Sequence, residues 1–209
     1  MKLLGCFFNA EVIAFGVLTG DVDRRVMDSK GFYLYQLELR GVLVMGKKGR
    51  EIVKVDIKEL LKDLNSAYAD EWIAYFHYTW AADFVEGPDY PTVAGELDRI
   101  AKEEFEHLSE LADRILELGG EPERDLEDLL KIANCKKVVF PKDERDLEGV
   151  LNAVADAEGC AIAVYNRLLL KVAACYEKDV RTFHLIQHIL SEEIEHEEAF
   201  ENLLEKKRK

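Results

Sequence analysis

The sequence predicts an all-α fold, a bundle of four long helices arranged as two antiparallel hairpins that a long crossover connects. Apolar residues recur at helical spacing through most of the chain from residue 56 to residue 206. Capping and breaking residues divide this stretch into four helical segments. The connections are short within each half and long between the halves, which is the connectivity of a bundle with one crossover.

The first hairpin is delimited by a cap, a break and a stop. Asp56 with Glu59 resembles a capping box, and the helix after it is expected to run to about Phe84. The sequence "VEGPDYP" breaks the helical pattern, and Pro91 suits the first turn of the next helix. That helix is expected to end at Leu118, because two glycines follow it.

The second hairpin is delimited by two aspartates. Asp143 is expected to cap a helix that runs to about Glu177, and Asp179 is expected to cap a last helix that runs to about Lys206. The turns are short in both hairpins, so the two helices of each hairpin are expected to be antiparallel neighbours.

The crossover, residues 119–142, leads from the end of the second helix to the start of the third. The second helix is about 40 Å long, at about 1.5 Å per residue. An irregular segment of this length covers that distance, because extended chain spans about 3.3 Å per residue. We expect one short helix within the crossover, at Leu126–Ile132.

Residues 1–44 do not continue the helical pattern, so the bundle domain is assigned to residues 45–209. The sequence "GFYLYQLELRGVLV" is typical of a β-strand, although nothing nearby obviously completes a sheet. Two interpretations stay open. The segment is either a small added β element, or it comes from a misassigned upstream reading frame and translation begins at Met45.

The composition suits one globular domain, with 48% hydrophobic residues and a formal net charge of -14. No segment is long and apolar enough to predict a membrane-spanning helix. Asn9 and Glu11 interrupt the apolar start of the chain, which argues against a signal peptide, and we expect a cytoplasmic protein. The acidity argues against nucleic acid as the main partner and suits a protein that attracts cations.

Two of the expected helices carry a Glu-x-x-His motif on their apolar face. Glu193 and His196 lie on the same side of the last helix as Phe200, and Glu104 and His107 repeat the spacing in the second helix. Burying a carboxylate and an imidazole is costly unless they have partners. Residues three apart are neighbours on a helix surface, so both side chains of each motif can reach one centre.

The other two helices each place one glutamate in the middle of the apolar face, Glu71 in the first helix and Glu158 in the third. Four buried carboxylates without cations would have to become protonated. Two divalent ions balance four carboxylates, and two histidines complete the set. One Glu from each of two helices with Glu-x-x-His from each of the others is the ligand pattern of di-iron and di-manganese bundles.

This prediction depends on the joint occurrence of the four elements in the order Glu, ExxH, Glu, ExxH. A single Glu-x-x-His is weak evidence in a chain with 42 acidic residues. His184 and His188 are one turn apart but lack an acidic partner at the same spacing, so we interpret them as surface or packing residues. His77 is interpreted as a packing residue.

With these motifs, residues 55–206 resemble the ferritin superfamily, in particular bacterioferritin and the archaeal Dps-like proteins called thioferritins. The sequence "ADEWIAYFHYTWAA" resembles the first helix of bacterioferritin. The resemblance implies that Glu71 is a terminal ligand and that the nearby Tyr78 is a candidate electron relay. It further implies that Glu104 and Glu158 bridge two irons. Three more residues would complete the catalytic metal site: His107, Glu193 and His196.

Departures from bacterioferritin narrow the resemblance. Bacterioferritin binds haem through a methionine next to its bridging glutamate, whereas Phe105 follows Glu104 here, so no haem is expected. The chain ends soon after the fourth helix, without the fifth helix of 24-subunit ferritins. Together with the short helix in the crossover, this favours a homo-oligomeric Dps-like cage of twelve subunits whose iron site lies within each bundle.

The resemblance to thioferritins also implies a disulfide between Cys135, in the crossover, and Cys160, just after Glu158. Such a disulfide would hold the crossover and contribute about 3 kcal/mol in the chain-entropy description. The alternative is two buried free thiols that act as small apolar groups. No role is assigned to Cys175 or Cys6.

The expected function is that of a ferroxidase that binds two irons per subunit. It would oxidise Fe(II) with hydrogen peroxide or dioxygen, store Fe(III), and protect the cell against oxidative stress. One alternative is a rubrerythrin-like peroxidase or catalase without storage, since carboxylates and imidazoles serve manganese as well as iron. Another is a DNA-binding architectural protein of the Dps type, for which the terminal "EKKRK" is a candidate basic cluster.

Overall fold

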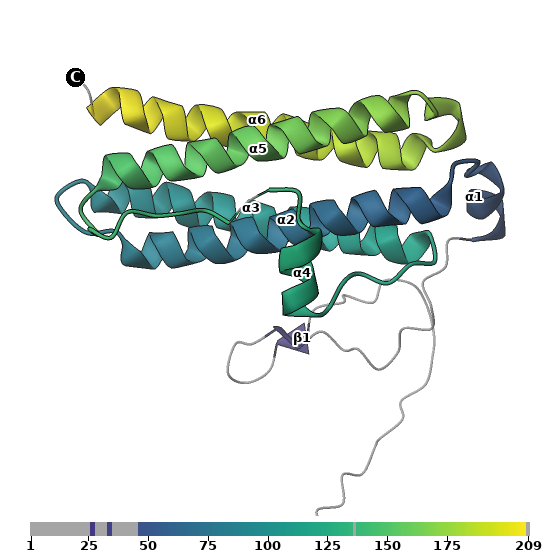
Figure 1. The fold of residues 1–209 in the computed structure, drawn as a ribbon, viewed down its shortest axis with the longest axis horizontal. Helices are drawn as coiled ribbons and strands as arrows, with labels where there is room; N and C mark the ends of the chain where they lie inside the picture. The colour runs from purple at the N-terminus through teal and green to yellow at the C-terminus, as the bar shows by residue number, and fades with distance from the viewer. Residues whose placement is uncertain (1–25, 28–32, 35–45, 136, 208–209) are drawn as a thin grey trace, which may run out of the picture. The chain divides into compact units, whose positions relative to one another are not determined.

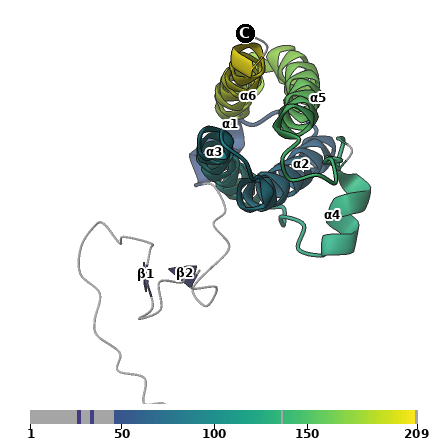
Figure 2. The ribbon, with the colours of Figure 1, turned by 90° about the vertical axis from the view of Figure 1, so that its left-hand side faces the viewer.

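Four long helices form an antiparallel bundle in the structure, a computed structural model that describes residues 26–27, 33–34, 46–135 and 137–207 (Figures 1 and 2). Helix α2 packs mainly on α3, and α5 mainly on α6, so each predicted hairpin is a packed pair. The predicted all-α bundle is therefore confirmed. The long helices are α2 (Ile57–Phe84), α3 (Tyr90–Glu117), α5 (Leu147–Ala173) and α6 (Val180–Lys207).

The crossover between α3 and α5 runs along the bundle and carries the short helix α4, Leu126–Ile132 (Figure 1). Asp125 begins this helix, because its side chain accepts hydrogen bonds from the backbone N–H groups of Glu127 and Asp128. Helix α4 contacts α2 on the outside of the bundle (Figure 2). The predicted crossover and the bounds of its short helix are confirmed.

Two of the three aspartates that were predicted as helix N-caps do cap their helices. The Asp56 carboxylate accepts a hydrogen bond from the Glu59 backbone N–H at 3.1 Å, and that of Asp179 accepts one from Thr182 at 3.1 Å. The prediction for Asp143 is wrong. Its carboxylate accepts from the Arg145 N–H in the turn before α5.

Helix α5 is shorter at both ends than expected. Asp146 is its N-cap, and the Asp146 carboxylate accepts from the Gly149 backbone N–H at 2.9 Å. The helix ends at Ala173, and the chain continues through the short 3-10 helix η2, Tyr176–Lys178. The turn into α6 is therefore a separate element and not a continuation of α5.

Two further features lie before α2. Helix α1, Lys47–Ile52, was not predicted. The strands β1 (Val26–Met27) and β2 (Tyr33–Leu34) pair antiparallel, with Val26 opposite Leu34. They do not belong to the unit that contains the bundle, Val42–Lys209. Strand β2 falls within the stretch expected to be a strand, and the rest of the predictions for residues 1–44 lie outside the described residues.

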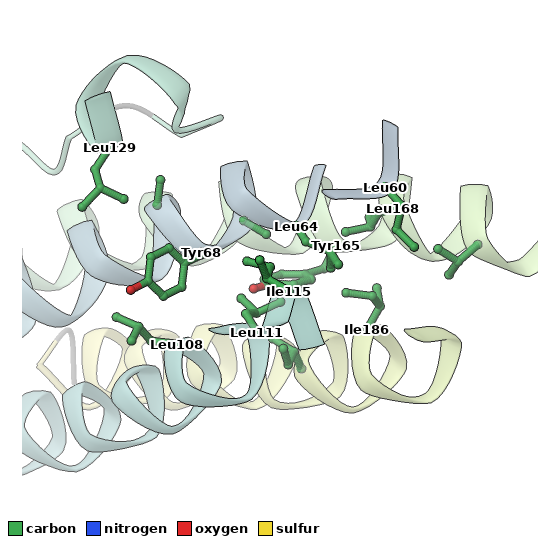
Figure 3. Packing of buried hydrophobic residues seen from close by; sticks show 14 residues of the cluster. Leu60, Leu64, Tyr68, Leu108, Leu111, Ile115, Leu129, Tyr165, Leu168 and Ile186 are labelled. Atoms are coloured by element: carbon green, nitrogen blue, oxygen red, sulfur yellow. The ribbon is translucent and has the colours of Figure 1, made fainter. Parts of the chain in front are cut away.

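The apolar core has two parts, which occupy different lengths of the same four helices. One cluster includes Leu64, Leu111 and Ile186, whose side chains meet between the helices (Figure 3). The other includes Leu97 and Phe200. On every long helix the predicted ligands fall between the segments that form the two clusters, so the burial of apolar surface on both sides fixes their position. No helix in the described part of the chain could cross a membrane.

Candidate metal centre

The six predicted ligands lie together in the middle of the bundle, and all are buried. Their exposure does not exceed 2% of the residue surface. Helices α3 and α6 each contribute a Glu-x-x-His pair, because residues three apart share a helix face. Helices α2 and α5 each contribute one glutamate. The six residues are Glu71, Glu104, His107, Glu158, Glu193 and His196.

The ligand atoms form two overlapping groups, and within each group they lie within 4.8 Å of one another. Glu104 and Glu193 belong to both groups, whereas Glu71 and Glu158 belong to one each. A bridging carboxylate must reach both ions. Glu104 and Glu193 are placed to reach both groups, whereas Glu158, for which the resemblance implied a bridging role, belongs to one group only. One group is Glu71, Glu104, His107 and Glu193, and the other is Glu104, Glu158, Glu193 and His196.

Both histidine rings present Nδ1 to the centre. His107 Nδ1 lies 3.1 Å from Glu193 Oε1 and 3.4 Å from Glu104 Oε2, and His196 Nδ1 lies 3.2 Å from Glu104 Oε1. Neither Nδ1 has a hydrogen-bond partner among the described residues, and the same is true of both Glu104 oxygens and of one oxygen each of Glu158 and Glu193. Buried polar atoms without partners are rare in folded proteins. Their type and convergence fit two divalent metal ions.

The electrostatics of the protein without metal are unfavourable in a way that bound cations would relieve. Burial, reinforced by neighbouring carboxylates, raises the pKa of Glu104 and Glu158 well above the usual range. Burial and the Glu104 carboxylate raise the pKa of Glu193 to about 8. Burial lowers the pKa of His107, but the surrounding carboxylates of Glu104 and Glu193 outweigh this and raise it. The cluster therefore retains protons, which metal binding would displace.

On the side of the ring that faces away from the centre, each histidine contacts a glutamate of the other helix of this pair, α3 or α6. His107 Nε2 lies 2.7 Å from Glu192 Oε2, and His196 Nε2 lies 2.9 Å from Glu103 Oε2. A proton on Nε2 that is donated to the carboxylate leaves Nδ1 free to bind a metal. Neither glutamate was predicted from the sequence. The available signal was the repeat itself, "EEFEH" in α3 and "EEIEH" in α6, in which a glutamate precedes each ligand pair.

Two buried tyrosines lie beside the glutamates of α2 and α5. Burial and the Glu158 carboxylate raise the pKa of Tyr78 well above its usual range. The Tyr165 hydroxyl donates a hydrogen bond to Glu71 Oε1 across the bundle. Tyr165 was not predicted as a site residue. Its spacing from Glu158 is the same as the spacing of Tyr78 from Glu71, and this repeat could have identified it.

A small cavity of about 30 Å³ connects the ligands with the crossover. Glutamates of the centre line it together with Tyr78, Asp70 and Cys135. Cys135 forms a disulfide with Cys160 of α5, the pair that the resemblance implied. The Asp70 carboxylate accepts hydrogen bonds from Asn134 Nδ2 and from the Cys135 backbone N–H, both at 2.8 Å. Burial raises the pKa of Asp70 to about 6.

The remaining histidines lie outside the ligand groups. His77 is half-buried, and its ring is 6.1 Å from that of Phe140. His184 lies beside Tyr176 at a ring distance of 6.1 Å. His188 is closer to the centre than expected, since its Nε2 lies 3.7 Å from Glu192 Oε2.

Comparisons with known proteins identify a family and several relatives. Residues 61–209 match the family model described as "Ferritin-like domain". The "DNA protection during starvation protein" of Pyrococcus furiosus is 34% identical over 163 residues, which cover 77% of this chain and 86% of that protein. The bacterioferritin of Desulfovibrio desulfuricans is 30% identical over 146 residues, which cover 69% of this chain and 74% of that protein.

Two solved structures of similar sequence share the fold. One is a protein of Bacteroides fragilis described as a dodecameric, bacterioferritin-related thioferritin, with 34% identity and a TM-score of 0.68 over 76% of this chain and 90% of that one. The other is the Desulfovibrio desulfuricans bacterioferritin, described by its diiron site, with 28% identity and a TM-score of 0.56 over 71% of this chain and 80% of that one. The chain therefore belongs to the ferritin-like family.

Proposed function

We propose that the chain is a ferroxidase subunit of a Dps-like mini-ferritin. One observation carries the proposal: carboxylate and imidazole atoms from four helices converge in the buried interior without hydrogen-bond partners among the described residues. Membership of the ferritin-like family supports Fe(II) as the substrate and storage of Fe(III) as the purpose. Ligands of these types also bind manganese, so metal analysis of the native protein belongs to the test.

The reaction needs two Fe(II) ions and an oxidant. Each Fe(II) loses one electron, and one hydrogen peroxide molecule takes both electrons and two protons to form two water molecules. Dioxygen is the alternative oxidant. This consumption of peroxide would protect a cytoplasmic compartment against oxidative stress.

The residues of the chain have separate tasks in this reaction. Glu104 and Glu193 would hold both Fe(II) ions, Glu71 and His107 one of them, and Glu158 and His196 the other. Four carboxylates balance the charge of two Fe(II) ions, so the protons retained by the centre are released as iron binds. Tyr78 lines the cavity beside Glu158 and is the candidate electron relay.

We further propose that twelve subunits assemble into a cage. The Bacteroides fragilis relative is described as dodecameric, which supports this stoichiometry. Large apolar side chains on the outside of the bundle also support assembly, with Phe76 and Leu130 each 64% exposed. Contacts between subunits would cover such residues.

The test is the oxidation of Fe(II) followed by absorbance. Protein without metal receives two Fe(II) per chain in the absence of oxygen, and peroxide is then added. We expect Glu104→Ala and Glu193→Ala to lower the rate at least about a hundredfold, because each removes a ligand that both ions share. The matched control is Glu195→Ala, which removes an exposed carboxylate two residues from Glu193. Unchanged oxidation in both ligand variants would contradict the assigned site.

The size of the particle separates the proposed cage from the peroxidase without storage. Light scattering is expected to give about twelve subunits, and the oxidised iron is expected to stay with the protein on gel filtration. A dimer that consumes peroxide and releases its iron would favour the peroxidase.

The name of the Pyrococcus furiosus relative keeps DNA protection as a second candidate function. The net charge of -14 opposes direct DNA binding, which a salt-dependent gel shift measures.

A further inference from the structure

The two halves of the metal centre have the same types of ligand but different surroundings. In one half Glu192 contacts Nε2 of His107, and in the other half Glu103 contacts Nε2 of His196. The side chains of these two glutamates are equally exposed, 36% for Glu192 and 35% for Glu103. Solvent screening is therefore similar for both carboxylates, so a difference in how strongly they act on the two histidines comes from the charges beside them.

Glu103 is already engaged by an arginine. Arg99 Nη1 donates to Glu103 Oε2 at 2.6 Å and to Glu103 Oε1 at 2.7 Å. Arg99 also contacts a glutamate one turn earlier in α3, because its Nε and Nη2 donate to Glu96 Oε1. The guanidinium carries a permanent positive charge. The negative charge of Glu103 is therefore shared between His196 and Arg99.

Glu192 has no such counter-charge in the described part of the chain. Its ion pairs there are with two histidines, His107 at 2.7 Å and His188 at 3.7 Å. His188 is half-exposed and also lies 3.9 Å from Glu110, a second carboxylate. Glu192 therefore polarises His107 more strongly than Glu103 polarises His196.

A second carboxylate adds to the same half of the centre. Asp70 directly precedes the ligand Glu71, is only 8% exposed, and lines the cavity that the ligands share. The hydrogen bonds from Asn134 and Cys135 stabilise its ionised form. The corresponding position on α5, before Glu158, is Ala157.

We propose that the two metal positions are unequal: the position formed with Glu71 and His107 binds a divalent cation first and more tightly, and Arg99 weakens the position formed with His196. This inference rests on the proposed dinuclear centre. A carboxylate behind a histidine makes the imidazole a stronger ligand, and nearby negative charge attracts the cation. Arg99 opposes both effects in one half of the centre.

The experiment uses the full chain without metal, Co(II) as the probe and no oxidant. Isothermal titration calorimetry is expected to give two unequal binding constants per chain. Crystals that contain one Co(II) per chain are expected to show stronger anomalous density beside His107 than beside His196. Circular dichroism of each variant checks that the helices are intact.

Two substitutions test the cause. Arg99→Gln is expected to raise the weaker constant about two- to fivefold, the range for a partly exposed charge, and to leave the stronger constant unchanged. Its matched control is Lys102→Gln, which removes a positive charge from the same helix, where Lys102 pairs with Asp98. Glu192→Gln is expected to lower the stronger constant about tenfold. The amide oxygen that replaces the carboxylate can still accept a hydrogen bond from His107, so Glu192→Gln removes the negative charge alone. Glu195→Gln is its control.

Two outcomes overturn the inference. Equal or reversed occupancy of the two positions in the unaltered protein contradicts the order of binding. The same binding constants in Arg99→Gln and Lys102→Gln contradict the role of Arg99. Both results leave the dinuclear centre in place. Failure to bind any Co(II) contradicts the proposed function as well, so the two failures are distinguishable.

Discussion

Buried charges occupy two regions of the bundle, and the regions differ in how their polar atoms are paired. The first is the candidate metal centre. The second, called here the arginine cluster, joins α3 to the start of α6 and consists of Arg114, Glu117, Asp179 and Thr182. Arg114 is 1% exposed, as deeply buried as the ligands.

Every nitrogen of the Arg114 guanidinium has a partner. Nε donates to Thr182 Oγ1 at 2.8 Å, Nη2 to Asp179 Oδ1 at 2.7 Å, and Nη1 to Glu117 Oε2 at 3.0 Å. In the metal centre, by contrast, six ligand atoms have no hydrogen-bond partner among the described residues. A buried charge that the protein pairs completely is a structural element, whereas one that the protein leaves unpaired points to a ligand from outside.

The largest expected loss of stability follows from disrupting the arginine cluster. Arg114→Ala leaves Asp179 buried without its cation, so we expect the free energy of unfolding to fall by about 3–5 kcal/mol in urea unfolding of the protein without metal. Arg181→Ala is the control, because Arg181 is 63% exposed and also pairs with Glu117. It should cost less than about 1 kcal/mol. Equal costs would show that the cluster does not act as a buried pair.

Each bound metal ion is expected to have the next largest effect on stability. Co(II) at a hundred times its dissociation constant should stabilise the unaltered protein by about 2.7 kcal/mol for each bound ion. Glu104→Ala should lose this gain, since Glu104 belongs to both ligand groups. Thermal unfolding with and without Co(II) measures the difference. A gain that survives in Glu104→Ala would move the metal site elsewhere.

The stability of the protein without metal should also fall as the pH rises. The pKa of Glu193 is raised from 4.5 to about 8, chiefly by burial, so between these values the folded state binds more protons than the unfolded state. Its contribution is complete below about pH 4.5 and is lost as the pH approaches about 8, by at most about 1.4 kcal/mol per pH unit. Urea midpoints at pH 5, 6.5 and 8 measure the slope. With Co(II) bound, the fall should disappear, and a rise in its absence would contradict the raised pKa.

The helices and the buried cluster of glutamates and histidines could be predicted because both leave a one-dimensional signal. Helical periodicity and caps such as Asp56 place the long helices, and a glutamate on an apolar stripe is conspicuous. The start of α5 was misplaced because Asp143 and Asp146 are both capable caps, and the turn that Asp143 makes with Arg145 decides between them. Helix α1, "KKGREI", has no apolar periodicity to predict it.

The rest of the candidate site depends on how the helices are rotated against one another. Spacing indicates that Glu158 and Glu193 face the centre but not which of them belongs to both groups of ligand atoms. Glu103 and Glu192 touch histidines of the opposite helix, and no pattern within one helix states such a contact.

The smallest expected changes in stability distinguish the candidate metal centre from the arginine cluster most directly, because Co(II) should alter only one of them. Tyr165→Phe removes the donor to Glu71 Oε1 and should destabilise the protein without metal by about 1 kcal/mol. Thr182→Val removes both the acceptor of Arg114 Nε and a donor to Asp179 Oδ2 at nearly the same volume, and should cost somewhat more. Co(II) should reduce the cost of Tyr165→Phe, because Glu71 then gains a cation as its partner, whereas the cost of Thr182→Val should stay the same. Urea unfolding of both variants with and without Co(II) makes the comparison, and an unchanged cost for Tyr165→Phe would place Glu71 among the structural charges instead of the ligands.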